Sequence, residues 1–172
     1  VRVVLDTRLR IPMESRLVQT AREVPVIVFC YAPDKDKKAA LEAAGVTVLE
    51  AKLLPKEELD ELFMQLGEFQ LSKEELNGRH ISLRNCLEQL GQRGLDSVLV
   101  EGRATIHGAA LQENCCDLVQ VYVAPKLFGG DGLSPIGGMG ITAPDKAVLL
   151  SEPTITRLGQ DLLLEYTRKE QF

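Results

Sequence analysis

The residues best suited to chemistry lie in one short stretch, VLVEGRATIHGAAL, at residues 98–111. An apolar run ends there on the carboxylate of Glu101, which is followed by Gly102 and by a segment typical of a helix. A carboxylate at the end of a strand can bind a polar ligand, and a glycine lets that ligand approach the backbone closely. The start of the following helix offers free N–H groups and the positive end of the helix dipole, which suit a phosphate.

A structural interpretation of the same stretch is as good from the pattern alone. In that interpretation Glu101 ends a strand in solvent, Gly102 makes a turn, and Thr105 helps to cap the helix. The choice between the two depends on the elements that must position these residues.

Strands and helices alternate along the chain, as the spacing of apolar residues and of turn signals indicates. The predicted strands cover residues 1–6, 24–31, 46–50, 97–101, 117–124, 148–158 and 162–169. The predicted helices cover residues 15–20, 34–44, 57–66, 81–92 and 105–113. This order predicts an α/β fold with a largely parallel sheet flanked by helices and a C-terminal antiparallel hairpin. Ligands of such sheets bind beyond the carboxyl ends of the strands, where Asp6–Thr7, Cys30–Tyr31 and Glu101–Gly102 lie.

The composition narrows the classes of protein to consider. With 172 residues, 45% of them hydrophobic, the chain suits a single domain with a real core. The net charge is −5, and positively and negatively charged residues are spread along the sequence. The sequence therefore lacks the basic stripe that is typical of a nucleic-acid-binding protein. No apolar run approaches the roughly 18 residues of a membrane span, and no signal peptide is present, which predicts a cytoplasmic location. Because Val1 lies inside a predicted strand, we expect the chain to be part of a longer polypeptide.

The cysteines and histidines predict no metal site. None of the four cysteines forms a C-x-x-C pair, and His80 and His107 lack the spacing of metal ligands. Reduced thiols are therefore the expected state. Gly137–Gly140 is no dinucleotide fingerprint either, because it follows a loop and Pro144 stands where a helix should run.

Three segments together resemble the pyrimidine reductase domain of riboflavin biosynthesis, the C-terminal half of the bifunctional deaminase–reductase. RVVLDTRLRIP at residues 2–12 is similar to the family pattern R-V-V-x-D-[ST]-x-L-R-x-P. VLVEGRATIHGAAL is similar to V-E-G-G-x-T-L-x-G-A-x-L, and DLVQVYVAPKLFGG at 117–130 to D-E-L-x-x-Y-x-A-P-K-L-x-G-G. The resemblance implies a dihydrofolate-reductase-like fold, of which residues 1–172 form about the C-terminal two-thirds as a single domain.

The resemblance also implies an activity and a site. The family uses NADPH to reduce the ribosyl group of 5-amino-6-(5-phosphoribosylamino)uracil to a ribityl chain. Glu101 matches the acid that contacts the substrate, while no catalytic acid or base can be assigned. The residues that match positions binding NADPH are Thr7, Gly102, Arg103, Ala104, Thr105, Ile106, His107, Gly108 and Ala109. The expected partners are a zinc deaminase domain preceding this chain and a second copy in a homodimer.

Two departures from the family leave alternatives open. Arg103 replaces the second glycine of the family pair, and it either pairs with a phosphate or obstructs the site. Contacts to the substrate phosphate precede Val1 in the family, so we expect residues 1–172 alone to be inactive. The alternatives are a related reductase for another pteridine or pyrimidine, and a non-catalytic domain kept for scaffolding or dimerisation.

Four further side chains are open to two interpretations. His107 lies where the family tends to have a small residue, which favours packing of its ring over a ligand contact. The arginines after the first strand either face the 2′-phosphate of NADPH or belong to a solvated loop; they are Arg8, Arg10 and Arg16.

Overall fold

A computed structural model describes residues 1–55, 80–129, 132–137, 139, 141 and 143–168. The chain divides into two compact units. The first unit comprises Val1–Asp60 and Gln70–Val98, and the second comprises Glu61–Phe69 and Leu99–Phe172. Each unit is described by itself.

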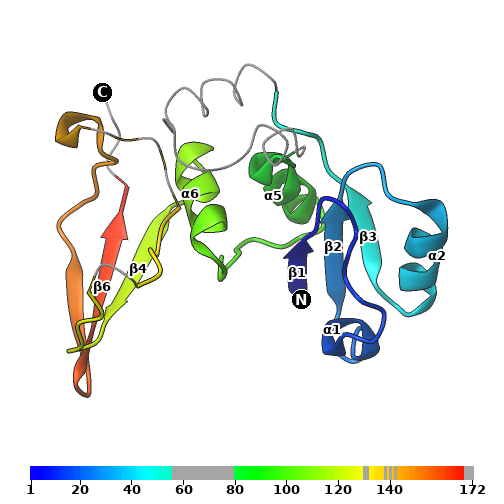
Figure 1. Cartoon of the computed structure of the whole chain (residues 1–172), viewed down its shortest axis with the longest axis horizontal. Coiled ribbons are helices and arrows are strands. Elements are labelled where there is room, and N and C mark those ends of the chain that lie inside the picture. The colour runs from blue at the N-terminus through cyan, green and yellow to red at the C-terminus, as the bar shows by residue number, and fades with distance from the viewer. Residues whose placement is uncertain (56–79, 130–131, 138, 140, 142, 169–172) are drawn as a thin grey trace. The chain divides into compact units, whose positions relative to one another are not determined.

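The first unit is built on a parallel three-stranded sheet in the order β1-β2-β3 (Figure 1). Its strands are β1 (Arg2–Leu5), β2 (Val26–Cys30) and β3 (Thr47–Glu50). Its helices are α1 (Arg16–Gln19), α2 (Lys35–Ala43) and α5 (Leu83–Gly91). All five residues of β2 are buried, because this strand is paired on both edges and covered on both faces.

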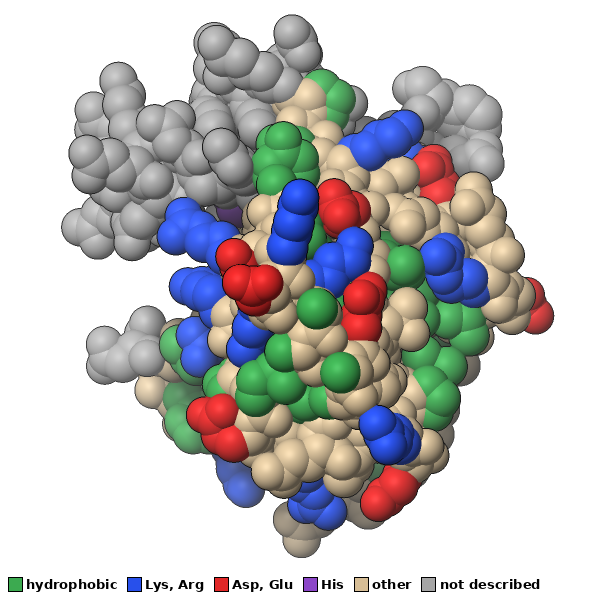
Figure 2. Space-filling model, turned by 90° about the vertical axis from the view of Figure 1, so that its right-hand side faces the viewer, with side chains coloured by type: hydrophobic (Ala, Val, Ile, Leu, Met, Phe, Trp, Pro, Cys, Tyr) green, Lys and Arg blue, Asp and Glu red, His purple; other side chains and the backbone are tan. Residues whose placement is uncertain are grey.

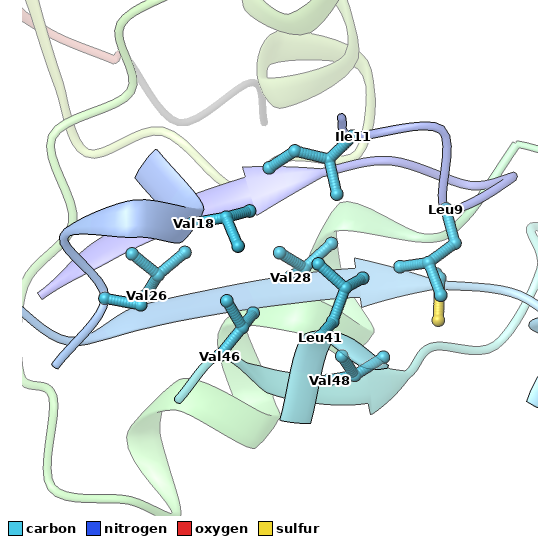
Figure 3. Close-up of a cluster of buried hydrophobic side chains, with 10 residues drawn as sticks. Leu9, Ile11, Val18, Val26, Val28, Leu41, Val46 and Val48 are labelled. Atoms are coloured by element: carbon cyan, nitrogen blue, oxygen red, sulfur yellow. The ribbon is translucent and has the colours of Figure 1, made fainter. Parts of the chain in front are cut away.

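Alternate residues of β2 supply the two halves of the core. Val26 and Val28 pack in one cluster with residues of α1 and α2, and Figure 3 shows these side chains converging. Ile27 and Phe29 point to the opposite face, where they pack with Leu90 of α5. The period of two along a strand thus explains why one short apolar run can hold helices on both faces.

Local signals set the ends of the helices in this unit. The Asp34 carboxylate accepts a hydrogen bond from the Lys37 N–H at 2.9 Å, so Asp34 caps α2. Gly45 follows that helix with a φ of +96°, which glycine adopts without strain. The Ser82 hydroxyl caps α5 in the same way through the Asn85 N–H at 3.2 Å.

The second unit joins one helix to an antiparallel sheet in the order β4-β6-β5. Its elements are α6 (Ala104–Gln112), β4 (Leu118–Val123), the short 3-10 helix η1 (Pro144–Lys146), β5 (Thr154–Leu158) and β6 (Asp161–Thr167). Leu158 pairs with Asp161, which confirms the predicted hairpin. Arg168 donates to the Leu111 carbonyl at 3.0 Å, which places a cation at the C-terminal end of α6.

The predicted strand at residues 97–101 is wrong. These residues adopt no strand conformation, and the side chain of Leu99 is 73% exposed. β-Branched residues favour a strand only where a neighbouring strand and a packed face receive them, and no described strand pairs with this segment. The described strands therefore form two three-stranded sheets.

Two other predicted elements are a strand that is shorter than expected and a helix that cannot be compared. The strand predicted from Val148 begins only at Thr154, because Pro153 has no N–H to offer to a β-ladder. The helix predicted at residues 57–66 lies outside the described residues.

The charged side chains are dispersed. Figure 2 shows basic and acidic side chains interspersed on one face of the molecule. Among the helices that are described, none is long and apolar enough to cross a membrane.

Candidate functional site

The turn Glu101–Gly102–Arg103 leads directly into α6 and is exposed at all three positions. Arg103 is the N-cap residue of α6, with φ −83° and ψ 163°. Within the described part of the chain, neither the Glu101 carboxylate nor the Arg103 guanidinium forms a hydrogen bond or an ion pair. Both charges are therefore free to meet a ligand.

The first turn of α6 lacks a side-chain cap. The Ile106 N–H donates to the Arg103 carbonyl at 3.0 Å, whereas the N–H groups of Ala104 and Thr105 reach no acceptor among the described residues. Thr105 is the second residue of the helix, two positions after the N-cap residue Arg103, so it does not cap the helix. Two unsatisfied N–H groups at the positive end of a nine-residue helix are the donors that an anion requires.

Gly102 also has a structural role. A Cβ atom at this position would lie 2.6 Å from Cγ2 of Ile106, one turn into the helix. The glycine therefore lets the turn fold back closely on α6, whether or not a ligand approaches it.

A second segment clamps the start of α6. The Gly137 N–H donates to the Ala104 carbonyl at 2.7 Å, and Nδ1 of His107 lies 2.9 Å from the Pro135 carbonyl. Because a carbonyl only accepts, Nδ1 of His107 carries the proton in this contact. The ring thus holds the Pro135–Gly137 segment, which agrees with a packing role for His107.

Glycine is required where these two segments touch. A Cβ at Gly137 would lie 3.0 Å from the Ala104 carbonyl oxygen, whereas one at buried Gly108 would lie 3.5 Å from the Gly137 oxygen. Sequence reasoning missed Pro135 and Gly137 as parts of the site. The only signal in the sequence is the glycine-rich segment, whose pattern does not match a dinucleotide fingerprint.

Gly137→Ala is expected to lower the free energy of unfolding by about 1 to 2 kcal/mol, because the new methyl group meets backbone atoms that cannot move aside. The matched control is Gly108→Ala, whose contact is ordinary and whose helix propensity improves by up to ~1 kcal/mol. Urea unfolding of both variants measures the difference. Equal losses in the two variants would contradict the clamp.

Thr7 belongs to the first unit, directly after β1. Its carbonyl accepts the Tyr31 N–H at 2.9 Å, and its half-buried hydroxyl has no hydrogen-bond partner among the described residues. Arg8, Arg10 and Arg16 nearby in sequence are exposed, and their guanidinium groups form no hydrogen bond or ion pair within the described ranges. The structure thus brings Gly102–Ala109 together in the second unit and places Thr7 in the first.

The cysteine at the end of β2 is not a reactive group. Burial raises the pKa of the Cys30 thiol to about 11, with a smaller contribution from the Glu50 carboxylate. Burial also raises the pKa of Cys116. At neutral pH both side chains are thiols rather than nucleophilic thiolates.

The chain is similar to known proteins over nearly its whole length. The family model described as the RibD C-terminal domain matches residues 1–164. The riboflavin biosynthesis protein RibD of Actinobacillus pleuropneumoniae is 32% identical over 167 residues, which cover 96% of this chain and 38% of that protein. The 2,5-diamino-6-ribosylamino-4(3H)-pyrimidinone 5′-phosphate reductase of Methanothermobacter thermautotrophicus is 34% identical over 92 residues, 53% of this chain and 43% of that protein.

A solved structure agrees with these relatives. Acinetobacter baumannii RibD superposes with a TM-score of 0.70 at 23% identity, covering 98% of this chain and 37% of that one. The likeness confirms the predicted dihydrofolate-reductase-like α/β fold. The chain spans less than half the length of these relatives. By its match over nearly all of its length, the chain belongs to the RibD C-terminal domain family.

Proposed function

We propose that this chain is the reductase part of a riboflavin-biosynthesis enzyme. The substrate is 5-amino-6-(5-phosphoribosylamino)uracil, whose ribosyl carbon is reduced to give the ribityl product. The observation that carries the proposal is the uncapped start of α6, preceded by a free carboxylate and a free guanidinium, in a chain of this family. The donor set fits the phosphates of NADPH, which when bound supplies the hydride.

The residues at the start of α6 hold the cofactor in this proposal. The N–H groups of Ala104 and Thr105 and the guanidinium of Arg103 bind phosphate oxygens through charge-assisted hydrogen bonds. The small residues Gly102 and Ala109 let the ligand approach the turn and the helix closely, whereas buried Gly108 serves the site indirectly through its contact with Gly137. Ile106 and His107 serve this site indirectly, because they pack against the turn and the clamp.

Glu101 binds the other reactant. Its carboxylate accepts hydrogen bonds from N–H groups of the pyrimidine or from hydroxyls of the sugar, which orients the carbon to be reduced. We assign no side chain as a catalytic acid or base. The contribution of the protein is therefore orientation and electrostatics.

The longer relatives support further parts of the proposal. The chain covers 38% of the RibD protein from Actinobacillus, so that relative has room for a further domain. We include in the proposal a zinc deaminase domain preceding this chain and, independently of this coverage, a homodimeric assembly. The free thiol of buried Cys30 fits a reducing cytoplasm.

The test is turnover by the full-length protein. NADPH oxidation, followed by absorbance, should depend on the phosphoribosylaminopyrimidine, and mass spectrometry should detect the ribityl product. Binding of NADPH without reduction of this substrate would favour a related reductase with another substrate. A chain that binds neither compound would favour a non-catalytic scaffold.

The choice of cofactor gives a second expected result. Arg8, Arg10 and Thr7 offer two cations and a hydroxyl to the 2′-phosphate that distinguishes NADPH from NADH. NADPH should bind about five- to tenfold more tightly than NADH, because an exposed ionic contact contributes roughly 1 kcal/mol to the binding free energy. Fluorescence titration of the full-length protein with both cofactors measures this ratio, and equal affinities would rule the preference out.

A further inference from the structure

The turn that follows β1 is closed by a single side chain. Oδ2 of Asp6 accepts the Ile11 N–H at 2.7 Å, and the Asp6 carbonyl accepts the Leu9 N–H at 2.9 Å. Asp6 therefore holds both the middle and the far end of the turn. A carboxylate acceptor makes the bond to Ile11 stronger than one between neutral groups.

Two buried side chains anchor the same turn from within. Leu9 and Ile11 are 3% and 8% exposed, and Figure 3 shows both pointing into the cluster that contains Val28 and Leu41. Leu9 has a φ of +52°, a conformation that a residue other than glycine keeps only where its surroundings enforce it. The buried anchors and the Asp6 carboxylate supply that enforcement.

The residues between the anchors point outwards. Arg8 and Arg10 are exposed and have no ion-pair partner in the described part of the chain, while Leu9 and Ile11 alternate with them and are buried. Thr7 precedes them with its carbonyl fixed by the Tyr31 N–H. A hydroxyl and two guanidinium groups are thus carried by a short backbone segment that is held at several points.

We propose that Asp6 is a positioning residue, whose carboxylate holds the Thr7–Arg10 turn in the conformation that presents both guanidinium groups to the 2′-phosphate of the cofactor. This inference rests on the proposed function. Asp6 itself contacts no phosphate, because its Oδ2 atom is engaged by Ile11 and its negative charge would repel the ligand. Its contribution is to keep most molecules in the binding-competent conformation.

The expected effect follows from that population. Without the carboxylate the Ile11 N–H loses its acceptor, and the strained conformation at Leu9 relaxes toward others. If about one molecule in ten retains the competent turn, the five- to tenfold preference for NADPH over NADH falls to below about twofold. NADH lacks this phosphate, so its affinity does not depend on the turn.

The test compares two substitutions at Asp6 in the full-length protein. Both remove the charge, but Asp6→Asn keeps an oxygen that can accept the Ile11 N–H, whereas Asp6→Ala does not. Asp6→Ala should weaken NADPH binding about four- to fivefold and leave NADH within twofold, while Asp6→Asn should keep or improve NADPH binding. Glu14→Ala is the matched control, because it removes an exposed carboxylate from the same loop without touching the turn.

The outcomes separate this inference from the proposed function. A wild-type protein with no preference for NADPH contradicts the proposed cofactor. A wild-type preference that survives in Asp6→Ala, or an equal loss for NADPH and NADH, overturns the positioning role alone. If Asp6→Ala does not fold, Asp6→Glu replaces it, because the longer side chain keeps the charge but moves the acceptor. That variant should also lose the preference, and an unchanged ratio would overturn the inference.

Discussion

Glu101→Gln in the full-length protein is expected to lower kcat/KM for the pyrimidine substrate. The loss of transition-state stabilisation should be about 1.5 to 3 kcal/mol, which is what a hydrogen bond to a charged group contributes. Glutamine keeps the size and shape of the side chain, but it has no charge and only one acceptor oxygen. The dissociation constant of NADPH should stay unchanged, because the proposed phosphate donors begin only at the start of α6. The free energy of unfolding should also change little, since Glu101 is exposed and has no partner among the described residues.

Steady-state kinetics and NADPH titration check this result together. Glu152→Gln is the control, because it removes an exposed carboxylate elsewhere in the same unit. Normal kinetics in Glu101→Gln would mean that this residue is only a solvated part of a turn.

Arg103→Gly is expected to weaken NADPH binding by about 1.5 to 3 kcal/mol, because a free guanidinium at the start of a helix is lost from the phosphate site. Glycine is well tolerated at an N-cap, so the stability of α6 should hardly change. Arg103→Ala separates the side chain from the backbone, and it should lose as much affinity as the glycine variant. Calorimetric titration with NADPH measures all three proteins.

The direction of this effect distinguishes the two roles considered for Arg103. Tighter binding in Arg103→Gly would show that the side chain obstructs the site. Unchanged binding in both variants would remove Arg103 from the site altogether.

Much of the fold was predictable because its signals are local. Asp34 and Gly45 mark the ends of α2 within a few residues of sequence, the first as the N-cap and the second as a glycine with positive φ. The apolar run of β2 requires cover on both faces, which the sheet provides. The same reasoning predicted the hairpin of β5 and β6, since its partners adjoin in sequence.

What could not be predicted depends on partners that are distant in sequence. Residues 97–101 have the composition of a strand, but composition cannot supply a neighbouring strand. The contact of Gly137 with Ala104 has no local signature either, because each residue alone suits an ordinary loop or helix. The candidate site could therefore be proposed from a contiguous stretch of sequence, whereas its clamp and the turn held by Asp6 required the structure.

The strand order β4-β6-β5 has a consequence for the protein while it is being synthesised. β4 pairs with β6 and not with β5, so the partner of Gln120 is Glu165, 45 residues further along the chain. At the usual pace of ribosomes, the apolar segment Leu118–Val123 emerges roughly 2 to 9 seconds before its partner. During that interval its N–H and C=O groups lack their native acceptors and donors, and another nascent chain can pair with them. Fast translation through residues 124–167, or a chaperone bound to this segment, would therefore raise the yield of correctly folded protein.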